Sequence, residues 1–352
     1  MLIIRQTRKL EHVKYSLQLP DGPARAGFDD LIPVPRAAPE LSLGEIDPSC
    51  SFMNKRLAAP LLINAMTGGH PEMLDINRSL ARVARQAALA MAVGSQRAAL
   101  DDPGVRETFA VVREENPGGL VLANLNAGCT LAEAREAVAM VKADGLQLHL
   151  NVAQELAMEE GEADFRGVLA RVGQVVRELE VPVVVKEVGF GLDRETVAAL
   201  VELGVRCLDV GGSGGTNFAA IEGRRRGRIG SYLEEWGMPT AVSLLEALSV
   251  AGGAKLIASG GVRNAFDAAR ALMAGAVLVG IARPLLQIIV HESEAAALGY
   301  IRELIDDLRS LMLLVGAWNL ETLRRRPLVI TGFTARWLET RGIDYHHYAR
   351  RR

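Results

Sequence analysis

The strongest constraint on the fold is a regular alternation of short apolar runs with amphipathic stretches. It begins near residue 60 and repeats eight times. Each run has the length of a strand and is mostly apolar, which is typical of strands that are covered on both faces. The runs occupy residues 60–66, 88–94, 120–126, 145–151, 181–187, 206–211, 255–260 and 276–282.

The stretches between the runs have helical periodicity. In 130–143, TLAEAREAVAMVKA, the apolar residues share one face, and Thr130 with Glu133 has the pattern of a capping box. Residues 165–179, 194–203 and 265–274 follow the same pattern. Eight strand–helix units predict an α/β fold, a (β/α)8 TIM barrel. A doubly wound open sheet is the alternative, because periodicity does not show whether a sheet closes.

The chain of 352 residues is longer than a plain barrel of about 250 residues. We interpret 1–352 as a single domain, with an N-terminal extension (1–55) over one end of the barrel, the barrel itself (56–300) and C-terminal helices with a tail (301–352). The longest connection lies between the sixth and seventh runs, and insertions of this kind usually form lids or binding loops.

Charge and composition exclude several classes of function. The formal net charge is −2 and aromatic residues make up 5%, which argues against a nucleic-acid partner. Arginine runs occur at 224–226, 324–326 and 350–352, and we expect the last two to lie in a solvated loop and the tail. Three cysteines without motif spacing, no signal peptide and no apolar run near ~18 residues predict a cytoplasmic protein without a membrane partner.

Polar residues and glycines gather at the carboxyl ends of the predicted strands, where a barrel carries its active site. Gln147, His149 and Asn151 alternate with leucines, so their side chains share one side of their strand. Lys186 would likewise point inward, and a buried lysine needs an anionic partner. That partner is either a ligand or, in a purely structural role, Glu187.

Glycine-rich loops follow the last strands, and backbone N–H groups approach a phosphate most easily where side chains are absent. SGGVRN (259–264) and GIARP (280–284) match the phosphate site that barrels place after strands 7 and 8. Tight turns are the alternative for either loop alone. His12 and His149 lack zinc-ligand spacing. Glu155 is a single carboxylate that suits Mg²⁺ shared with a phosphate, or a favourable interaction with a helix dipole.

These stretches together resemble a known family, the type 2, flavin-dependent isopentenyl diphosphate isomerases. The resemblance extends in order over nearly the whole chain, and the combination of QLHLNVAQE with DVGGSGGT is its most specific part. One departure follows the fourth strand, where Glu162-Ala163 replaces an Asp-Arg-like pair. The matching stretches are RKLEH (8–12), INAMTGG (63–69), GSQRAAL (94–100), ANLNAG (123–128), QLHLNVAQE (147–155), VKEVGFG (185–191), DVGGSGGTNFAAIE (209–222), ASGGVRN (258–264) and GIARP (280–284).

The resemblance implies an enzyme that interconverts isopentenyl and dimethylallyl diphosphate with reduced FMN and Mg²⁺. NADPH or NADH would be the reductant, and the protein would be a homotetramer or homo-octamer. By position, the resemblance assigns the catalytic roles to Gln154, Lys186 and His149, and the Mg²⁺ ligand role to Glu155. It assigns FMN contacts to Met66, Thr67, Ser95, Asn124, Lys186, Thr216, Gly261, Val262, Arg263, Ala282 and Arg283. It assigns substrate contacts to Arg8, Lys9, His12, Ser95, Gln96, Arg97, His149, Asn151 and Gln154.

Three other functions fit the sequence less well. An FMN-dependent 2-hydroxy-acid oxidase or dehydrogenase needs a histidine base in a His-Gly-Gly setting, and the loop 211–215 has no histidine. An inosinate-type dehydrogenase needs a loop cysteine, whereas Cys207 falls within a predicted strand and Cys129 at the start of a helix. A non-catalytic phosphate-binding barrel has no use for Lys186, Gln154 and Glu155 together.

Overall fold

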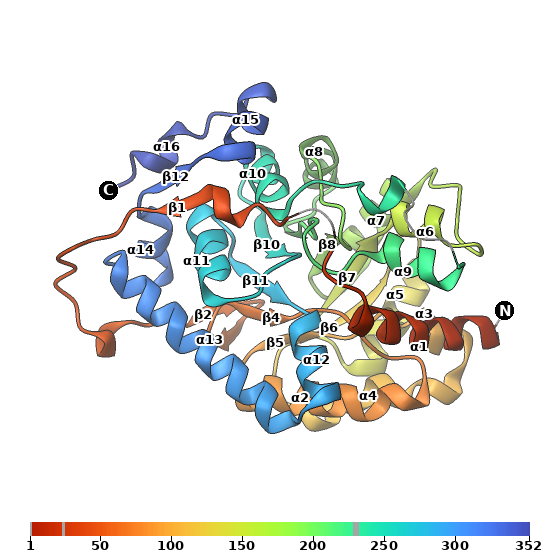
Figure 1. The fold of residues 1–352 in the computed structure, drawn as a ribbon. Coiled ribbons are helices and arrows are strands. Elements are labelled where there is room, and N and C mark those ends of the chain that lie inside the picture. The colour runs from red at the N-terminus through yellow and green to blue at the C-terminus, as the bar shows by residue number, and fades with distance from the viewer. Residues whose placement is uncertain (1, 23–24, 228–231) are drawn as a thin grey trace.

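Eight parallel strands close into a barrel in the computed structural model, which describes residues 2–22, 25–227 and 232–352 (Figure 1). The order around the barrel is β10-β11-β4-β5-β6-β7-β8-β9. Each strand falls within one of the predicted runs, so the barrel is confirmed and the open sheet is excluded. The strands are β4 (Leu61–Ile63), β5 (Ala90–Ala92), β6 (Val121–Asn126), β7 (Gly145–Leu150), β8 (Val183–Glu187), β9 (Cys207–Asp209), β10 (Lys255–Ser259) and β11 (Leu278–Ile281).

Helices cover the outside of the barrel. The predicted capping box is present at the start of α5 (Leu131–Val141), where Thr130 and Glu133 satisfy each other's backbone N–H groups. The other helices between and after the barrel strands are α2 (Leu74–Gln86), α3 (Arg97–Asp101), α4 (Glu107–Glu115), α6 (Val152–Ala157), α7 (Val168–Glu178), α8 (Arg194–Glu202), α9 (Phe218–Arg225), α10 (Thr240–Val250), α11 (Ala265–Ala274) and α12 (Arg283–His291).

Side chains alternate along the strands as the sequence predicts. Leu146, Leu148 and Val185 belong to the core between strands and helices, whereas Val184 packs in a second cluster inside the barrel. Phe52 also belongs to this inner cluster. It comes from the hairpin of β2 (Cys50–Phe52) and β3 (Lys55–Leu57), which therefore plugs the amino-terminal end of the barrel. The carboxyl-terminal end is left open for polar residues.

The N-terminal extension reaches both ends of the barrel, although we expected it at one. Helix α1 (Leu2–Gln18) packs on α3, α9 and α12. Further along, β1 (Leu31–Pro33) pairs antiparallel with β12 (Leu328–Ile330), so the two terminal segments lie side by side (Figure 1).

The C-terminal helices are α13 (Glu294–Leu314), α14 (Leu320–Arg325), α15 (Gly332–Thr340) and α16 (His346–Ala349). Helix α13 begins before residue 300, where we placed a boundary. Ser293 caps its first turn by accepting a hydrogen bond from the Ala296 N–H, which sets the start of the helix at Glu294.

The expectation of a solvated loop and tail is wrong for three arginines of the C-terminal runs. Arg324 Nε donates to the carbonyl of Ala276 (3.2 Å), and Arg351 Nη1 donates to that of Met273 (2.6 Å). Arg326 donates to the carbonyl of Gly316. Backbone carbonyls at the ends of helices and loops lack partners of their own, and these guanidinium groups supply them.

Within the described residues, no helix combines the length and the apolar character that crossing a membrane requires. The three cysteines are free thiols.

Candidate active site

A pocket of about 680 Å³ opens at the carboxyl ends of the barrel strands and is bounded on one side by α1. It collects residues that are far apart in the sequence. From the predicted site, the residues that line it are Arg8, Lys9, His12, Met66, Ser95, Arg97, Asn124, His149, Asn151, Gln154, Glu155, Lys186, Thr216, Gly261, Val262, Arg263, Ala282 and Arg283.

The side chains of two predicted residues are engaged inside the fold instead. The hydroxyl of Thr67 bonds the amide oxygen of Asn77, and both residues are buried. The amide of Gln96 is fully buried; it donates to the carbonyl of Ala137 (2.9 Å) and accepts from the Asn124 N–H (2.9 Å). These two side chains therefore support the strand ends that carry the pocket.

A line of polar side chains crosses the barrel beneath the pocket and begins at Asp209. The buried Asp209 carboxylate accepts hydrogen bonds from Ser259 Oγ (2.6 Å) and from Asn64 Nδ2 (2.7 Å). The Asn64 oxygen then accepts from Gln147 Nε2 (3.0 Å) and from the Ala65 N–H (2.9 Å). A backbone N–H only donates, so the bond from Ala65 shows that the oxygen of Asn64 faces Ala65 and Gln147 and that its nitrogen faces Asp209.

The orientation of Asn64 in turn determines which atom donates and which accepts in each hydrogen bond as far as His149. Because the nitrogen of Gln147 is committed to Asn64, its oxygen accepts from Asn124 Nδ2 (2.9 Å). The oxygen of Asn124 then faces His149 Nδ1 at 3.0 Å and accepts the ring proton. Burial and the cations Lys186 and Lys9 lower the pKa of His149 to about 3. A hydrogen bond with the Leu125 backbone opposes this shift without reversing it. The free protein therefore presents a neutral imidazole, and the Asn124 bond places its proton on Nδ1 and leaves Nε2 unprotonated.

We expect Gln147→Leu to disturb this arrangement. Without either bond at position 147, the Asn124 amide is free to turn, and His149 populates both neutral tautomers. The ¹⁵N spectrum of the FMN-loaded protein measures this directly. Ser259→Ala is the control. It removes a hydrogen bond to Asp209, but that bond does not determine which way the Asn64 amide points. A protonated Nε2 in the parent protein would contradict the assignment.

Lys186 is buried at the end of β8, and the carboxylate of Glu187 does not neutralise it through a direct bond. Lys186 Nζ donates to the backbone carbonyl of Glu187 (2.6 Å). Glu187 Oε2 instead accepts from the next four backbone N–H groups, including Phe190 N at 2.5 Å. Burial raises the pKa of Glu187 to about 7, against the effect of these donors and of Lys186. The geometry thus favours a ligand as the direct partner of Lys186.

Buried charged side chains on α9 bond to side chains of helix α1 and hold that helix over the pocket. His12 Nε2 lies 2.6 Å from Glu222 Oε1, and the Glu222 side chain is fully buried. Arg225 also bonds Glu222 and lies 2.8 Å from Glu11. Burial raises the pKa of Glu222, but His12 and Arg225 outweigh it and the net shift is downward. The first arginine run therefore has a structural role, through Arg225.

Two cations of α1 face the pocket. Arg8 Nη1 lies 3.6 Å from Glu160, and its Nε is buried without a hydrogen-bond partner in the described part of the chain. Lys9 is half-buried, and burial, together with the neighbouring Arg8, lowers its pKa to about 7. Two cations held this close favour an anionic ligand.

Asn151, Gln154 and Glu155 lie around the start of α6. Asn151 Nδ2 donates to Glu155 Oε1 (2.8 Å), and Glu155 Oε2 accepts from the Glu162 N–H (2.9 Å). The segment at Glu162, where the chain departs from the family pattern, therefore touches the proposed metal ligand. No group of three or more candidate metal ligands occurs among the described residues. A magnesium ion fits here only when a bound phosphate supplies further oxygens.

The loops after β10 and β11 already hold an anion. Asp21 accepts from Arg263 Nε (2.7 Å) and Arg283 Nη1 (2.8 Å), which shows that the predicted phosphate loops attract a carboxylate. Gly261 has φ +74°, and a Cβ there would lie 2.6 Å from the Gly214 carbonyl oxygen. Arg283 Nε is buried without a partner in the described residues. These loops and the buried Lys186 fit the phosphate and ring ends of FMN.

Sequence reasoning missed several residues that organise the site. Asn64 and Asp209 lie in the matching stretches, and the placement of Asn64 after a strand was a usable signal. Glu222 bonds His12, and Asp21 bonds Arg263. The partners in each pair lie more than 200 positions apart in the sequence. No local pattern in the sequence predicts such pairs.

The fold and this site define the class of protein, a flavin-dependent (β/α)8 barrel. Residues 121–330 match the family model "FMN-dependent dehydrogenase". Solved structures agree at the level of the fold. A lactate oxidase of Pediococcus acidilactici, described as putative, has a TM-score of 0.68 at 15% identity and covers 91% of this chain and 88% of its own. A mandelate oxidase has a TM-score of 0.63 at 18% identity, with 91% and 92% covered.

Closer relatives identify the family within this class. The isopentenyl-diphosphate delta-isomerase of Moorella thermoacetica is 51% identical over 96% of this chain and 97% of its own length. The enzymes of that name from a Geobacillus strain and from Symbiobacterium thermophilum are each 46% identical over at least 98% of both chains. The chain belongs to the isopentenyl-diphosphate delta-isomerase family, in its FMN-dependent form.

Proposed function

We propose that this protein interconverts isopentenyl and dimethylallyl diphosphate at the barrel mouth, with reduced FMN and Mg²⁺. The observation that carries the proposal is the convergence of the α1 cations, the phosphate loops and the buried Lys186 on one pocket. Moving a double bond means adding a proton at one carbon and removing one from another, and an unactivated alkene is a weak base. Reduced FMN would supply the strong acid next to the alkene.

The chain's own residues bind and orient the reactants. Arg8, Lys9 and Arg97 hold the diphosphate, with Glu155 binding it through Mg²⁺. His149 meets the substrate as a neutral ring with a bare Nε2, so it binds the diphosphate only after taking up a proton. Lys186 balances negative charge on the reduced flavin ring. Gln154, which is buried beside Asn151, orients the reacting end of the substrate.

The central experiment measures isomerisation of isopentenyl diphosphate by the FMN-loaded protein. We expect activity after photoreduction in the presence of Mg²⁺, and a loss of at least about a hundredfold with oxidised FMN or with EDTA. Full activity with oxidised FMN would overturn the proposed chemistry. Turnover of a 2-hydroxy acid would instead favour the oxidase alternative.

Substrate affinity is expected to fall as the pH rises above about 7. Lys9 has a pKa of about 7 in the free protein, and a bound diphosphate stabilises its charged form. Below pH 7 the charge is already present, whereas above pH 7 binding must also protonate Lys9. KM therefore rises up to about tenfold per pH unit. Lys9→Met raises KM and flattens this slope, whereas the exposed Lys14→Met keeps it. An unchanged slope in Lys9→Met would assign it to another group.

Three further points are proposed from the family resemblance. NADPH or NADH serves as the reductant, the protein functions in the cytoplasm, and it assembles as a homotetramer or homo-octamer. Stopped-flow reduction with each nucleotide and light scattering of the FMN-loaded protein test the first and third points.

A further inference from the structure

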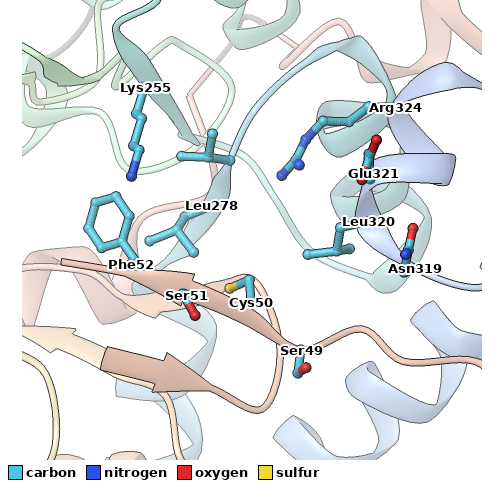
Figure 2. A pocket seen from close by; sticks show the side chains of 11 residues that line it. Ser49, Cys50, Ser51, Phe52, Lys255, Leu278, Asn319, Leu320, Glu321 and Arg324 are labelled. Atoms are coloured by element: carbon cyan, nitrogen blue, oxygen red, sulfur yellow. The ribbon is translucent and has the colours of Figure 1, made fainter. Parts of the chain in front are cut away.

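A second pocket lies at the opposite, amino-terminal end of the barrel, and no step of the proposed reaction uses it. Its volume is about 390 Å³, within the range of small-molecule sites. Lys255 and Leu278 are the first residues of β10 and β11, so they mark the end away from the mouth. We call it the base pocket; its main lining residues are Cys50, Phe52, Lys255, Leu278, Leu320 and Arg324 (Figure 2).

The base pocket contains two cations without a carboxylate partner. Figure 2 shows the guanidinium of Arg324 pointing into the space beside Leu278 and Leu320. Among the residues that the structure describes, only its Nε has a hydrogen-bond partner, the carbonyl of Ala276 at 3.2 Å. Lys255 Nζ lies 5.7 Å from the centre of the Phe52 ring. Within the described part of the chain, neither Arg324 nor Lys255 forms a salt bridge.

The nearby acidic groups are committed elsewhere or uncharged. Glu321, which also lines the pocket, pairs with Arg325 at 2.6 Å. Asp47 lies outside the lining and faces Arg56 at 3.6 Å. Burial raises the pKa of the Cys50 thiol to about 11, so it stays neutral at physiological pH. The positive charge of the pocket is therefore left for a ligand.

The opposite wall is apolar. Leu278 and Leu320 are buried, and Phe52 presents its ring under Lys255 (Figure 2). A guanidinium binds carboxylate or phosphate through parallel hydrogen bonds, and an aromatic or aliphatic wall favours a flat apolar group. We propose that the base pocket binds a small molecule in which a compact oxyanion, phosphate or carboxylate, is joined to a short apolar group.

Phenyl phosphate is the probe, added to the full chain loaded with FMN while inorganic diphosphate with Mg²⁺, which lacks an apolar group, occupies the barrel mouth. Calorimetry is expected to show saturable binding. Arg324→Gln weakens it at least about tenfold, because a charge-assisted pair is lost. Arg302→Gln is the matched control: it removes the same charge from an exposed position on α13 and leaves binding unchanged. Lys255→Gln is the second variant and weakens binding in the same direction.

Three further arms define the ligand chemistry. Inorganic phosphate is expected to bind at least about tenfold more weakly than phenyl phosphate, and benzyl alcohol to give no saturable binding. Benzoate competes with phenyl phosphate if a carboxylate is the natural group, and fails to compete if phosphate is. A soaked crystal should place the probe's phosphate within hydrogen-bond distance of Arg324. Equal binding by Arg324→Gln and Arg302→Gln, or density only at the barrel mouth, refutes the proposal.

Discussion

Lys186→Met is expected to lower kcat for isomerisation about 10²–10³-fold, the usual cost of removing one preorganised donor from an active site. The methionine keeps the length of the side chain but not the charge. Lys186 is buried at the end of β8 and lines the pocket, and within the described ranges its Nζ donates to one carbonyl, that of Glu187, which leaves donors for a ligand. A ligand that carries negative charge there loses its cation.

The same substitution has a readout that is independent of turnover. Loss of a charge-assisted hydrogen bond worth about 1.5–3 kcal/mol makes the midpoint potential of bound FMN about 30–60 mV more negative, because the anionic reduced ring is less stabilised. Lys14→Met, an exposed residue on α1, should change neither quantity. If Lys186→Met keeps the parent potential and FMN affinity, Lys186 does not face the flavin.

Glu155→Gln is expected to raise the Mg²⁺ concentration needed for half-maximal activity at least about a hundredfold. Glutamine still occupies the space, and its single oxygen can keep one of the two hydrogen bonds, from Asn151 or from the Glu162 N–H, but it no longer attracts the ion by charge. High Mg²⁺ should therefore restore much of the rate. Excess FMN should not.

Glu159→Gln is the matched control for this experiment. Glu159 is exposed four residues further along and does not line the pocket, so the same loss of charge should leave the Mg²⁺ requirement unchanged. A Glu155→Gln enzyme with the parent Mg²⁺ dependence would remove Glu155 from the metal site and leave it as a hydrogen-bond partner of Asn151 and of the Glu162 N–H.

The barrel could be predicted from the sequence because its signals are local. Each strand is a short apolar run and each helix has its own periodicity, down to the capping box of Thr130 and Glu133 at α5. Closure was not visible in the pattern. It depends on β11 pairing with β4, more than 200 positions away, as in Val279 with Leu61.

The site could be predicted in part, for the same physical reason. Residues at strand ends, such as His149 and Lys186, follow from alternation and the geometry of a barrel. What His149 does depends on the Asn64 amide, whose direction comes from Asp209 on another strand. Thr67 and Gln96 show the converse: their motifs match the family, yet their side chains bond inside the fold.

The pairing of β11 with β4, which closes the barrel, also sets when the protein can fold during synthesis. Strand β4 leaves the ribosome early, but its partner β11 follows only after residue 277, and β12, the partner of β1, after residue 327. At about 5–20 residues per second, the edge of β4 stays unpaired for roughly 10–40 seconds. Through that interval the nascent chain exposes an apolar edge strand, which favours the binding of a chaperone. A chain released from the ribosome before β11 is made would keep that edge exposed.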